Sequence, residues 1–313
     1  MAAYHGTREA FAAALMELAH RDERVVFVSP DSLKAMRATA FAETFPDRYV
    51  EVGIAEQCAV DVAGGLASCG LTPFVATYAG FLTMRACEQM RTFVAYPNLN
   101  VKFVGINGGL IGGEREGVTH QFYEDIGILS SIPNFAIFTP ADGNQLYHAM
   151  LAAAETQGPV YIRAGSGKEP DIYTLDAPFR LEGVTVWRED GYEALLLSSG
   201  FVLDRALEAA DILYKQGFRV TTADINIIRH SNPETLLKLL AKAQCVVTVE
   251  DHSIYGGLGS WVQGLVCETS PKHVSRIGIQ NVFGESGDAK ALADAYGLSA
   301  QTIVQTVVRE IGR

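Results

Sequence analysis

Short apolar runs alternate with longer segments of helical periodicity along nearly the whole chain. The apolar runs, rich in β-branched residues, predict buried strands at 25–29, 49–52, 72–76, 101–106, 135–139 and 160–163, and again at 194–198, 219–224, 246–250 and 274–279. The intervening patterns predict helices at 7–20, with Thr7 as its cap, and at 34–45, 55–68, 81–95, 144–156, 201–216, 233–243, 260–268, 288–296 and 299–311. This alternation predicts the α/β class, with doubly wound, mostly parallel sheets covered by helices on both faces.

The alternation stops after residue 163, where glycines, prolines and mixed charges replace it. We interpret residues 169–190 as a linker between a first domain, residues 1–168, and a smaller second domain, residues 191–313. A length of 313 residues fits two domains of ordinary size.

Composition narrows the class of protein. Asp and Glu number 36 against 25 Lys and Arg, a net charge of −11, which disfavours binding to nucleic acid or to an anionic membrane. No apolar run approaches the roughly 18–20 residues of a spanning helix, and the N-terminus lacks the layout of a signal peptide. The five cysteines are odd in number and have no CxxC spacing, so free thiols in a reducing cytoplasm are expected.

Common nucleotide and metal motifs are absent from the sequence. Residues 164–169 resemble a phosphate loop but lack the required first glycine and the final Ser or Thr. A complete dinucleotide fingerprint, an HExxH motif and an EF-hand loop are also missing. NAD, ATP and a metal held by this chain alone therefore have no positive support.

Three segments combine polar or aromatic residues with positions near strand ends. Glu56 lies at a strand-to-helix junction, Tyr78 and Phe81 follow a buried strand, and His120 lies in a glycine-rich loop. Ligands of parallel α/β sheets gather at the carboxyl ends of strands. Each segment also has an ordinary explanation, because carboxylates favour helix N-termini, aromatic residues pack in cores and loop histidines are often solvated.

Taken together, these segments resemble the C-terminal half of transketolase, most closely the small subunit of split, two-chain transketolases. The matching motifs run nearly from end to end: Gly6-Thr7-Arg8-Glu9-Ala10-Phe11, Val52-Gly53-Ile54-Ala55-Glu56-Gln57, Phe81-Leu82-Thr83-x-Arg85-Ala86, Gly117-x-Thr119-His120-Gln121, Gly158-Pro159-Val160-Tyr161-Ile162-Arg163, Asp251-His252-x-x-x-Gly256-Gly257-Leu258-Gly259 and Gly284-Glu285-Ser286-Gly287. The resemblance implies a pyrimidine-binding domain followed by a transketolase C-terminal domain. We assign His252, in the family-typical glycine turn, to packing and assembly rather than to chemistry.

The resemblance implies a thiamine diphosphate enzyme. Glu56 matches the family's glutamate that hydrogen-bonds the pyrimidine N1′ and promotes the tautomer that removes the thiazolium C2 proton. Such a carboxyl has to stay protonated near neutral pH. Tyr78 and Phe81 match aromatic residues that enclose the pyrimidine ring, and Asp31 matches an aspartate near the cofactor.

The resemblance also implies a site for sugar phosphates. His120 matches a catalytic-site histidine that touches the sugar hydroxyls near the reacting carbon, and Arg163 and Arg8 match arginines that grip the phosphate. Glu116 takes the place of an aspartate that recognises a hydroxyl, although residues 114–119 hold one residue more than is usual.

Alternative interpretations of the three arginines stay open. Arg163 could form a salt bridge at the edge of the linker, and Arg8 could be solvated on the first helical turn. Arg85 lies one helical turn after Phe81 and could reach the substrate, or it could pair with Glu88.

Half of the expected cofactor site is missing from the sequence. Family diphosphate domains bind Mg²⁺ or Ca²⁺ through a Gly-Asp-Gly motif, which does not occur here. We therefore expect a separate diphosphate-binding subunit, an α₂β₂ complex, and a homodimer of this chain. Rival interpretations are a subunit similar to 1-deoxyxylulose-5-phosphate synthase or to the β chain of a 2-oxoacid dehydrogenase, and a non-catalytic interaction subunit.

Overall fold

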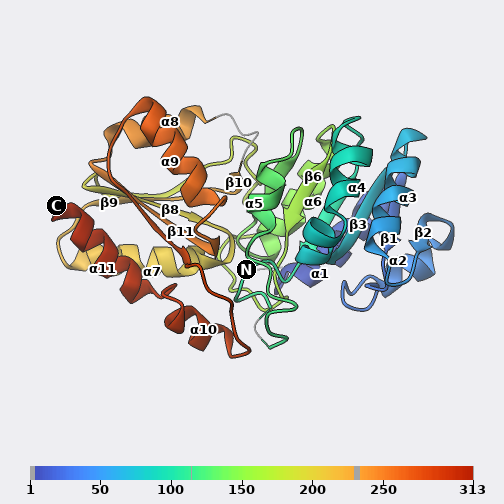
Figure 1. The fold of residues 1–313 in the computed structure, drawn as a ribbon, viewed down its shortest axis with the longest axis horizontal. Coiled ribbons are helices and arrows are strands. Elements are labelled where there is room, and N and C mark those ends of the chain that lie inside the picture. The colour runs from blue at the N-terminus through green and yellow to red at the C-terminus, as the bar shows by residue number, and fades with distance from the viewer. Residues whose placement is uncertain (1–3, 114, 229–232, 313) are drawn as a thin grey trace.

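The computed structural model describes residues 4–113, 115–228 and 233–312 and consists of two α/β domains lying side by side (Figure 1). Each domain is built on its own sheet, one of seven strands and one of five. The predicted fold class is confirmed.

The first sheet has the strand order β10-β5-β6-β4-β3-β1-β2. Its parallel strands are β1 (Val25–Ser29), β2 (Tyr49–Glu51), β3 (Thr72–Tyr78), β4 (Lys102–Ile106), β5 (Ala136–Phe138) and β6 (Val160–Arg163). The edge strand β10 (Ile227–Ile228) comes from the second half of the chain and runs antiparallel to β5. The second half of the chain thus completes the first sheet.

Helices cover both faces of this sheet because successive strand residues point in opposite directions. Val25 and Phe27 pack in the cluster with α1 (Thr7–Arg21), α2 (Thr39–Thr44) and α6 (Gly143–Glu155). Val26 and Val28 pack in the opposite cluster with α3 (Glu56–Ser68), the π-helical segments Phe81–Arg85 and Met90–Ala95, and α5 (Asp125–Ser130). The short α4 (Cys87–Gln89) joins the two π-helical segments, and a 3₁₀ turn (Pro46–Arg48) precedes β2.

The second sheet has the order β12-β11-β8-β9-β7. Its parallel strands are β8 (Ala194–Ser199), β9 (Val220–Asp224), β11 (Cys245–Ser253) and β12 (Val274–Ile279), and β7 (Thr185–Glu189) is antiparallel to β9. One face of this sheet is covered by a 3₁₀ turn (Gly200–Val202), α7 (Leu203–Lys215), α10 (Ala289–Ala295) and α11 (Ala300–Ile311). The other face is covered by α8 (Glu234–Lys242) and α9 (Leu258–Thr269).

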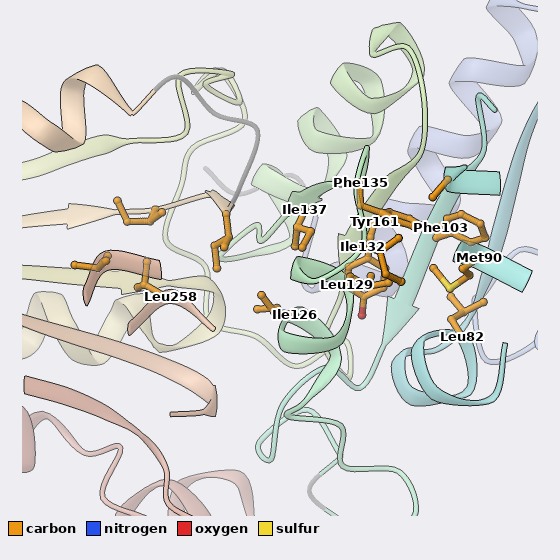
Figure 2. Packing of buried hydrophobic residues seen from close by; sticks show 14 of the residues in the cluster. Leu82, Met90, Phe103, Ile126, Leu129, Ile132, Phe135, Ile137, Tyr161 and Leu258 are labelled. Atoms are coloured by element: carbon orange, nitrogen blue, oxygen red, sulfur yellow. The ribbon is translucent and has the colours of Figure 1, made fainter. Parts of the chain in front are cut away.

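A hydrophobic cluster joins the two domains. Figure 2 shows it running from Leu82, Met90 and Phe103 in the first domain through Ile126 toward Leu258 in the second. Since buried apolar area is the main stabilising term in folding, the two domains share part of their core rather than meeting through solvent.

The structure differs from the sequence predictions in five places. The helix expected at 34–45 is reduced to α2, and the one expected at 81–95 is interrupted by π-helical turns. Helix α5 was not predicted, and β7 lies inside the expected linker. Thr7 is not a side-chain cap: its backbone N–H donates to Glu169 Oε2 at 2.8 Å, and its hydroxyl accepts from the N–H of Gly165.

Two further findings concern the described part of the chain. None of its helices combines the length and apolar character needed to cross a membrane. No cluster of three or more acidic, cysteine or histidine side chains suited to a metal ion occurs in these residues.

Candidate functional site

The candidate residues converge at one edge of the first sheet. Tyr78 ends β3 opposite Ile106 of β4, and Gly105 of β4 is paired with Arg163 at the end of β6. Because these strands are parallel, their carboxyl ends and the loops that follow lie together.

Glu56 begins helix α3 at this edge, and its side chain is only 3% exposed. The turn before it is fixed by Glu51, whose Oε1 accepts the N–H groups of Asp31 at 2.7 Å and Gly53 at 2.8 Å. Gly53 has φ 71°, a conformation that glycine adopts without strain. The local backbone therefore directs a carboxyl group into a position shielded from water.

Four rings form an aromatic cluster next to this carboxyl group. Tyr78 and Phe81 have centroids 5.4 Å apart, and the His120 ring lies 4.8 Å from Tyr78 and 5.3 Å from Phe81. Phe122 contacts Phe81 edge to face at 5.4 Å. Gly80 permits this packing, because a Cβ there would lie 1.9 Å from the Phe122 ring.

Arg85 joins the carboxyl group to the aromatic cluster. Its Nη1 donates to Glu56 Oε1 at 2.7 Å, and its guanidinium carbon lies 4.2 Å above the centroid of Phe81. Both contacts depend on the π-helical segment that carries Phe81 and Arg85, a type of turn frequent at functional sites. Arg85 therefore pairs with Glu56 rather than with Glu88, and its expected contact with the substrate stays a prediction.

A group of three polar residues lies within electrostatic reach of Tyr78. Arg8 Nη2 donates to Asn107 Oδ1 at 2.8 Å, and the Asn107 amide donates to Glu116. Burial raises the pKa of the Tyr78 phenol, and Glu116 raises it further while Arg8 opposes both. A cavity of about 180 Å³ lies here, with Arg8, Asn107 and Glu116 in its wall.

Arg163 is buried and paired with a carboxylate, and the phosphate-binding role expected for it stays a prediction. Its side chain is 3% exposed and forms a two-pronged ion pair with Asp125, Nε to Oδ2 at 2.8 Å and Nη2 to Oδ1 at 3.0 Å. Nη2 also donates to the carbonyl groups of Phe122 and Asp251. Burial alone would raise the pKa of Asp125, but the Arg163 cation, His252 and the hydrogen bonds from Arg163 and Tyr161 together hold this pKa below its usual range.

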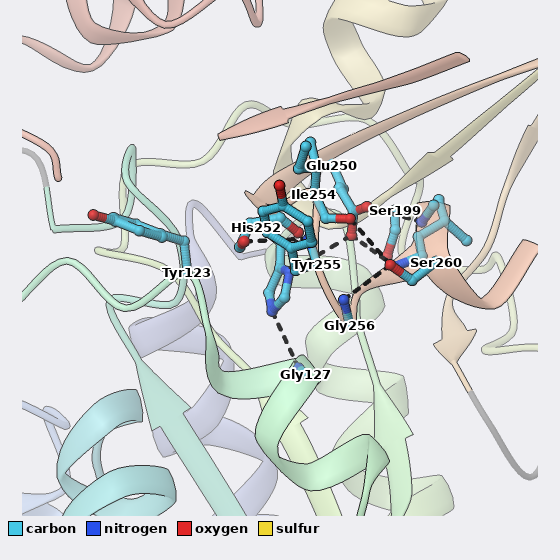
Figure 3. Close-up of polar contacts among 12 residues, drawn as sticks. Tyr123, Gly127, Ser199, Glu250, His252, Ile254, Tyr255, Gly256 and Ser260 are labelled. Atoms are coloured by element: carbon cyan, nitrogen blue, oxygen red, sulfur yellow. Dashed lines mark hydrogen bonds and ion pairs between the residues drawn. The ribbon is translucent and has the colours of Figure 1, made fainter. Parts of the chain in front are cut away.

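The ion pair belongs to a buried polar network between the domains, part of which Figure 3 shows. His252 Nε2 accepts the N–H of Gly127 at 3.2 Å, across the domain boundary. Burial lowers the pKa of His252 to about 4, so the ring is neutral near pH 7. Burial raises the pKa of Glu250 to about 7, although this carboxyl accepts two N–H groups at the start of α9. The position of His252 agrees with its expected packing role.

The structure thus separates the candidate residues into groups. The fold brings together Glu56, Tyr78, Phe81, His120 and Arg85. Beside them, Arg8 and Glu116 lie around Asn107. The exposed side chain of Asp31 lies at the end of β1, one strand from β3, so its cofactor role stays a prediction. Sequence reasoning missed Asn107 as the link between Arg8 and Glu116; its position directly after a strand was the available signal.

Comparison with known proteins gives consistent matches across the chain. Residues 4–168 match the transketolase pyrimidine-binding domain, and residues 183–303 match the transketolase C-terminal domain. The chain is 34% identical over 301 residues to a 6-deoxy-6-sulfo-D-fructose transketolase subunit of Clostridium sp. (strain MSTE9), covering 96% of this chain and 93% of the relative. It is 32% identical over 301 residues to one of the subunits of an apulose-4-phosphate transketolase of Phocaeicola vulgatus, covering 96% of each.

A solved structure described as a split-gene transketolase in an inactive β4 tetramer has the same fold. It superposes with a TM-score of 0.89 at 35% identity, and 99% of each chain is covered. The agreement extends over both domains. The chain belongs to the transketolase family.

Proposed function

We propose that this chain is the pyrimidine-binding subunit of a two-chain, thiamine diphosphate-dependent transketolase that transfers a two-carbon ketol unit between sugar phosphates. The observation that carries the proposal is the buried carboxyl group of Glu56 beside the Phe81 ring, at the carboxyl edge of a parallel sheet. The transketolase family implies the cofactor.

The Arg85 guanidinium occupies the place between Glu56 and Phe81 where the cofactor's pyrimidine ring would bind, so its contacts show whether the two residues suit that ring. It is a planar group with N–H donors, and it simultaneously donates to Glu56 and stacks on Phe81. An aminopyrimidine ring needs the same two contacts, one at N1′ and one on its face. The residues therefore fit the ring, and the side chain of Arg85, which is 48% exposed, is packed loosely enough to yield its place.

When bound, thiamine diphosphate supplies the acidic C2 position and the electron sink for cleaving a carbon–carbon bond. Glu56 holds a proton at the pyrimidine N1′, and its burial excludes water from that hydrogen bond. Phe81 and Tyr78 orient the ring, and His120, in contact with both, contributes a polar edge toward the sugar hydroxyls. Asp31 would approach the cofactor from the end of β1.

The proposed substrates are sugars with a terminal anionic group. The names of two relatives specify a sulfo-sugar and a sugar phosphate, which supports this class. Arg8 supplies a cation and Glu116 a hydroxyl acceptor beside Tyr78, in the same cavity. We assign neither the donor nor the acceptor sugar.

A second chain would supply the diphosphate and metal site. The sequence contains no Gly-Asp-Gly motif, and two relatives are named as subunits. The β4 tetramer described as inactive supports self-association of such chains without activity. We therefore propose an α₂β₂ complex in which pairs of this chain form the centre, since symmetric oligomers pair equivalent sites.

Calorimetric titration with cofactor and Mg²⁺ tests the proposal. The chain alone should bind thiamine diphosphate weakly and show no ketol transfer, because it offers receptors only for the pyrimidine end. Addition of the diphosphate-domain chain that co-purifies with it should restore both binding and transfer. Stoichiometric micromolar binding together with ketol transfer by this chain alone would contradict the two-chain proposal.

A further inference from the structure

The Arg85 guanidinium and the cofactor's pyrimidine ring need the same two contacts, so they exclude each other. Arg85 Nη1 donates to Glu56 Oε1 at 2.7 Å, and its guanidinium carbon lies 4.2 Å from the centroid of the Phe81 ring. We propose that Arg85 is an internal competitor of the pyrimidine ring, and that its displacement couples cofactor binding to the uptake of one proton by Glu56. This inference rests on the proposed function.

The two competing partners of Glu56 require different protonation states. The contact with Arg85 is an ion pair, in which a permanent cation that only donates hydrogen bonds meets an ionised carboxylate. The pyrimidine N1′ is an acceptor, so the proposed bond to it needs the protonated carboxyl group as its donor. When one partner replaces the other, a carboxylate oxygen of Glu56 therefore gains a proton from solvent, and Arg85 keeps its own charge.

The two side chains differ in exposure, and this decides which of them changes charge. Glu56 is 3% exposed, whereas the side chain of Arg85 is 48% exposed. A buried carboxylate that loses its cation is strongly unfavourable, and a proton removes that charge. A half-exposed arginine can turn its charged end into water while its aliphatic stem stays on the protein surface. Glu56 therefore changes its protonation state, and Arg85 changes its position.

The π-helical segment fixes Phe81 independently of Arg85. Leu82 and Thr83, between these two residues, are fully buried, and the Thr83 hydroxyl donates to the carbonyl group of Ala79 at 2.9 Å. The inner side of the segment is thus held in the core, while Arg85 reaches back from its end over the Phe81 ring. Displacement of Arg85 needs only a side-chain movement, and the Phe81 ring stays in place for the pyrimidine.

Other titratable groups near this edge are separated from Glu56 by their chemistry. Burial alone would raise the pKa of Glu51, but hydrogen bonds from Tyr49 and from two backbone N–H groups hold it below its usual range. On the neighbouring helices, burial and the charge of Glu88 raise the pKa of Asp61. His120 contacts Phe81 from the loop and is a second proton acceptor at this edge. A measurement at pH 8, above the ordinary range of histidine, keeps these groups from contributing.

Proton uptake makes the affinity for the cofactor depend on pH. While Glu56 is ionised against Arg85 and protonated against the pyrimidine, each unit of pH should weaken binding about tenfold. Removal of the cation leaves Glu56 buried alone, which favours its protonated form before the cofactor binds. Arg85→Met should therefore flatten this pH dependence.

Calorimetry of the reconstituted complex measures the coupled proton directly. Thiamine diphosphate is titrated with Mg²⁺ at pH 8 in two buffers of different ionisation enthalpy, and the difference in heat gives the number of protons taken up. Protons exchanged at the diphosphate and the metal are common to all proteins compared. The wild type should therefore take up about one proton more than Arg85→Met or Glu56→Gln.

Affinity in the same titrations measures the competition. Arg85→Met should bind the cofactor about three- to thirtyfold more tightly than the wild type at pH 8, because no ion pair or cation–π contact has to be broken. Arg85→Lys keeps a cation beside Glu56 and should keep the proton uptake. Arg91→Met is the matched control: this exposed arginine of the next π-helical segment donates to Thr92, and its loss should change affinity less than about twofold.

The outcomes separate this inference from the proposed function. Binding by Arg85→Met that is no tighter than that of the wild type, proton uptake equal in the two proteins, or the same gain in Arg91→Met would each overturn the inference alone. Failure of the wild-type complex and of every variant to bind the cofactor would overturn it together with the proposed function.

Discussion

Two arginines at the same edge of the first sheet have opposite environments. Arg163 ends β6, is 3% exposed and has its charge neutralised by Asp125. Arg8, on the first turn of α1, lines a cavity and keeps a buried Nε without an acceptor in the described structure. Both matched phosphate-binding positions in the sequence, yet only Arg8 faces a space that a ligand could occupy.

The difference between them comes from neighbouring elements. Asp125 lies at the start of α5, where it also accepts the hydroxyl of Tyr161 at 2.7 Å. Helix α5 thus supplies the carboxylate that pairs with Arg163, and Arg163 also joins the domains through the Asp251 carbonyl. The partners of a charged residue, rather than the motif that contains it, therefore decide its environment.

The largest expected effect is on stability when Arg163 is replaced. Arg163→Met leaves Asp125 charged and buried without its cation, which should lower the free energy of unfolding by about 3–5 kcal/mol. Arg8→Met should lower it by less than about 1 kcal/mol. Urea unfolding at pH 7 measures both values.

A double variant sharpens this result. Adding Asp125→Leu to Arg163→Met should recover much of the lost stability, because the buried charge is then removed as well. Equal stability losses for Arg163→Met and Arg8→Met would contradict the assignment of Arg163 to a closed network.

A smaller, pH-dependent effect is expected at His252. Burial lowers its pKa to about 4, below the ordinary value of about 6.5, so the folded state excludes a proton that the unfolded state binds. The stability associated with the neutral ring is present above about pH 6.5 and is lost as pH falls through about 4, a change of about 3 kcal/mol.

His252→Gln isolates this contribution from that of Glu250. The raised pKa of Glu250 acts in the opposite direction, since its stabilising contribution is lost as pH rises through about 7. Urea unfolding of both proteins from pH 7 to pH 4 should show the advantage of the wild type shrinking as pH falls. A difference that stays constant with pH would contradict the buried, neutral histidine.

The smallest expected effect compares two phenylalanines. Phe103 is fully buried in β4, and Phe103→Leu should cost about 1–2 kcal/mol of stability without affecting the cofactor. Phe81 is half-buried in the aromatic cluster, and Phe81→Leu should cost less stability but weaken cofactor binding about 2–10-fold through lost stacking. Thermal unfolding and calorimetry of the reconstituted complex measure the two effects, and the reverse pattern would contradict the placement of Phe81 in the site.

Strong periodicity made most of the fold predictable. Strands such as β1 and β6 are buried on both faces, so their apolar runs identify them directly. Helix α5 is six residues long and has a weak pattern, and the π-helical segments depend on packing that periodicity does not encode. Strand β7 has exposed and half-buried residues, which concealed it within the expected linker.

The position of a candidate residue in the fold is predictable where a motif fixes it on a strand end or helix start. Glu56, Tyr78 and Phe81 are of this kind, because local backbone geometry determines their direction. The partners of Arg163 and Arg8 lie 38 and 99 residues away in sequence, so spacing could not reveal which arginine is neutralised. Arg85 as the partner of Glu56 likewise requires the tertiary fold.

The central claim is that Glu56 handles a proton on the cofactor, and exchange of the C2 proton for deuterium tests it most directly. In the reconstituted complex with bound thiamine diphosphate, Glu56→Gln should slow this exchange by about 10²–10⁴, because the amide cannot cycle a proton at N1′. Glu88→Gln, a carboxyl change on the neighbouring α4, should leave the exchange rate unchanged. Exchange at the wild-type rate in Glu56→Gln would contradict the account.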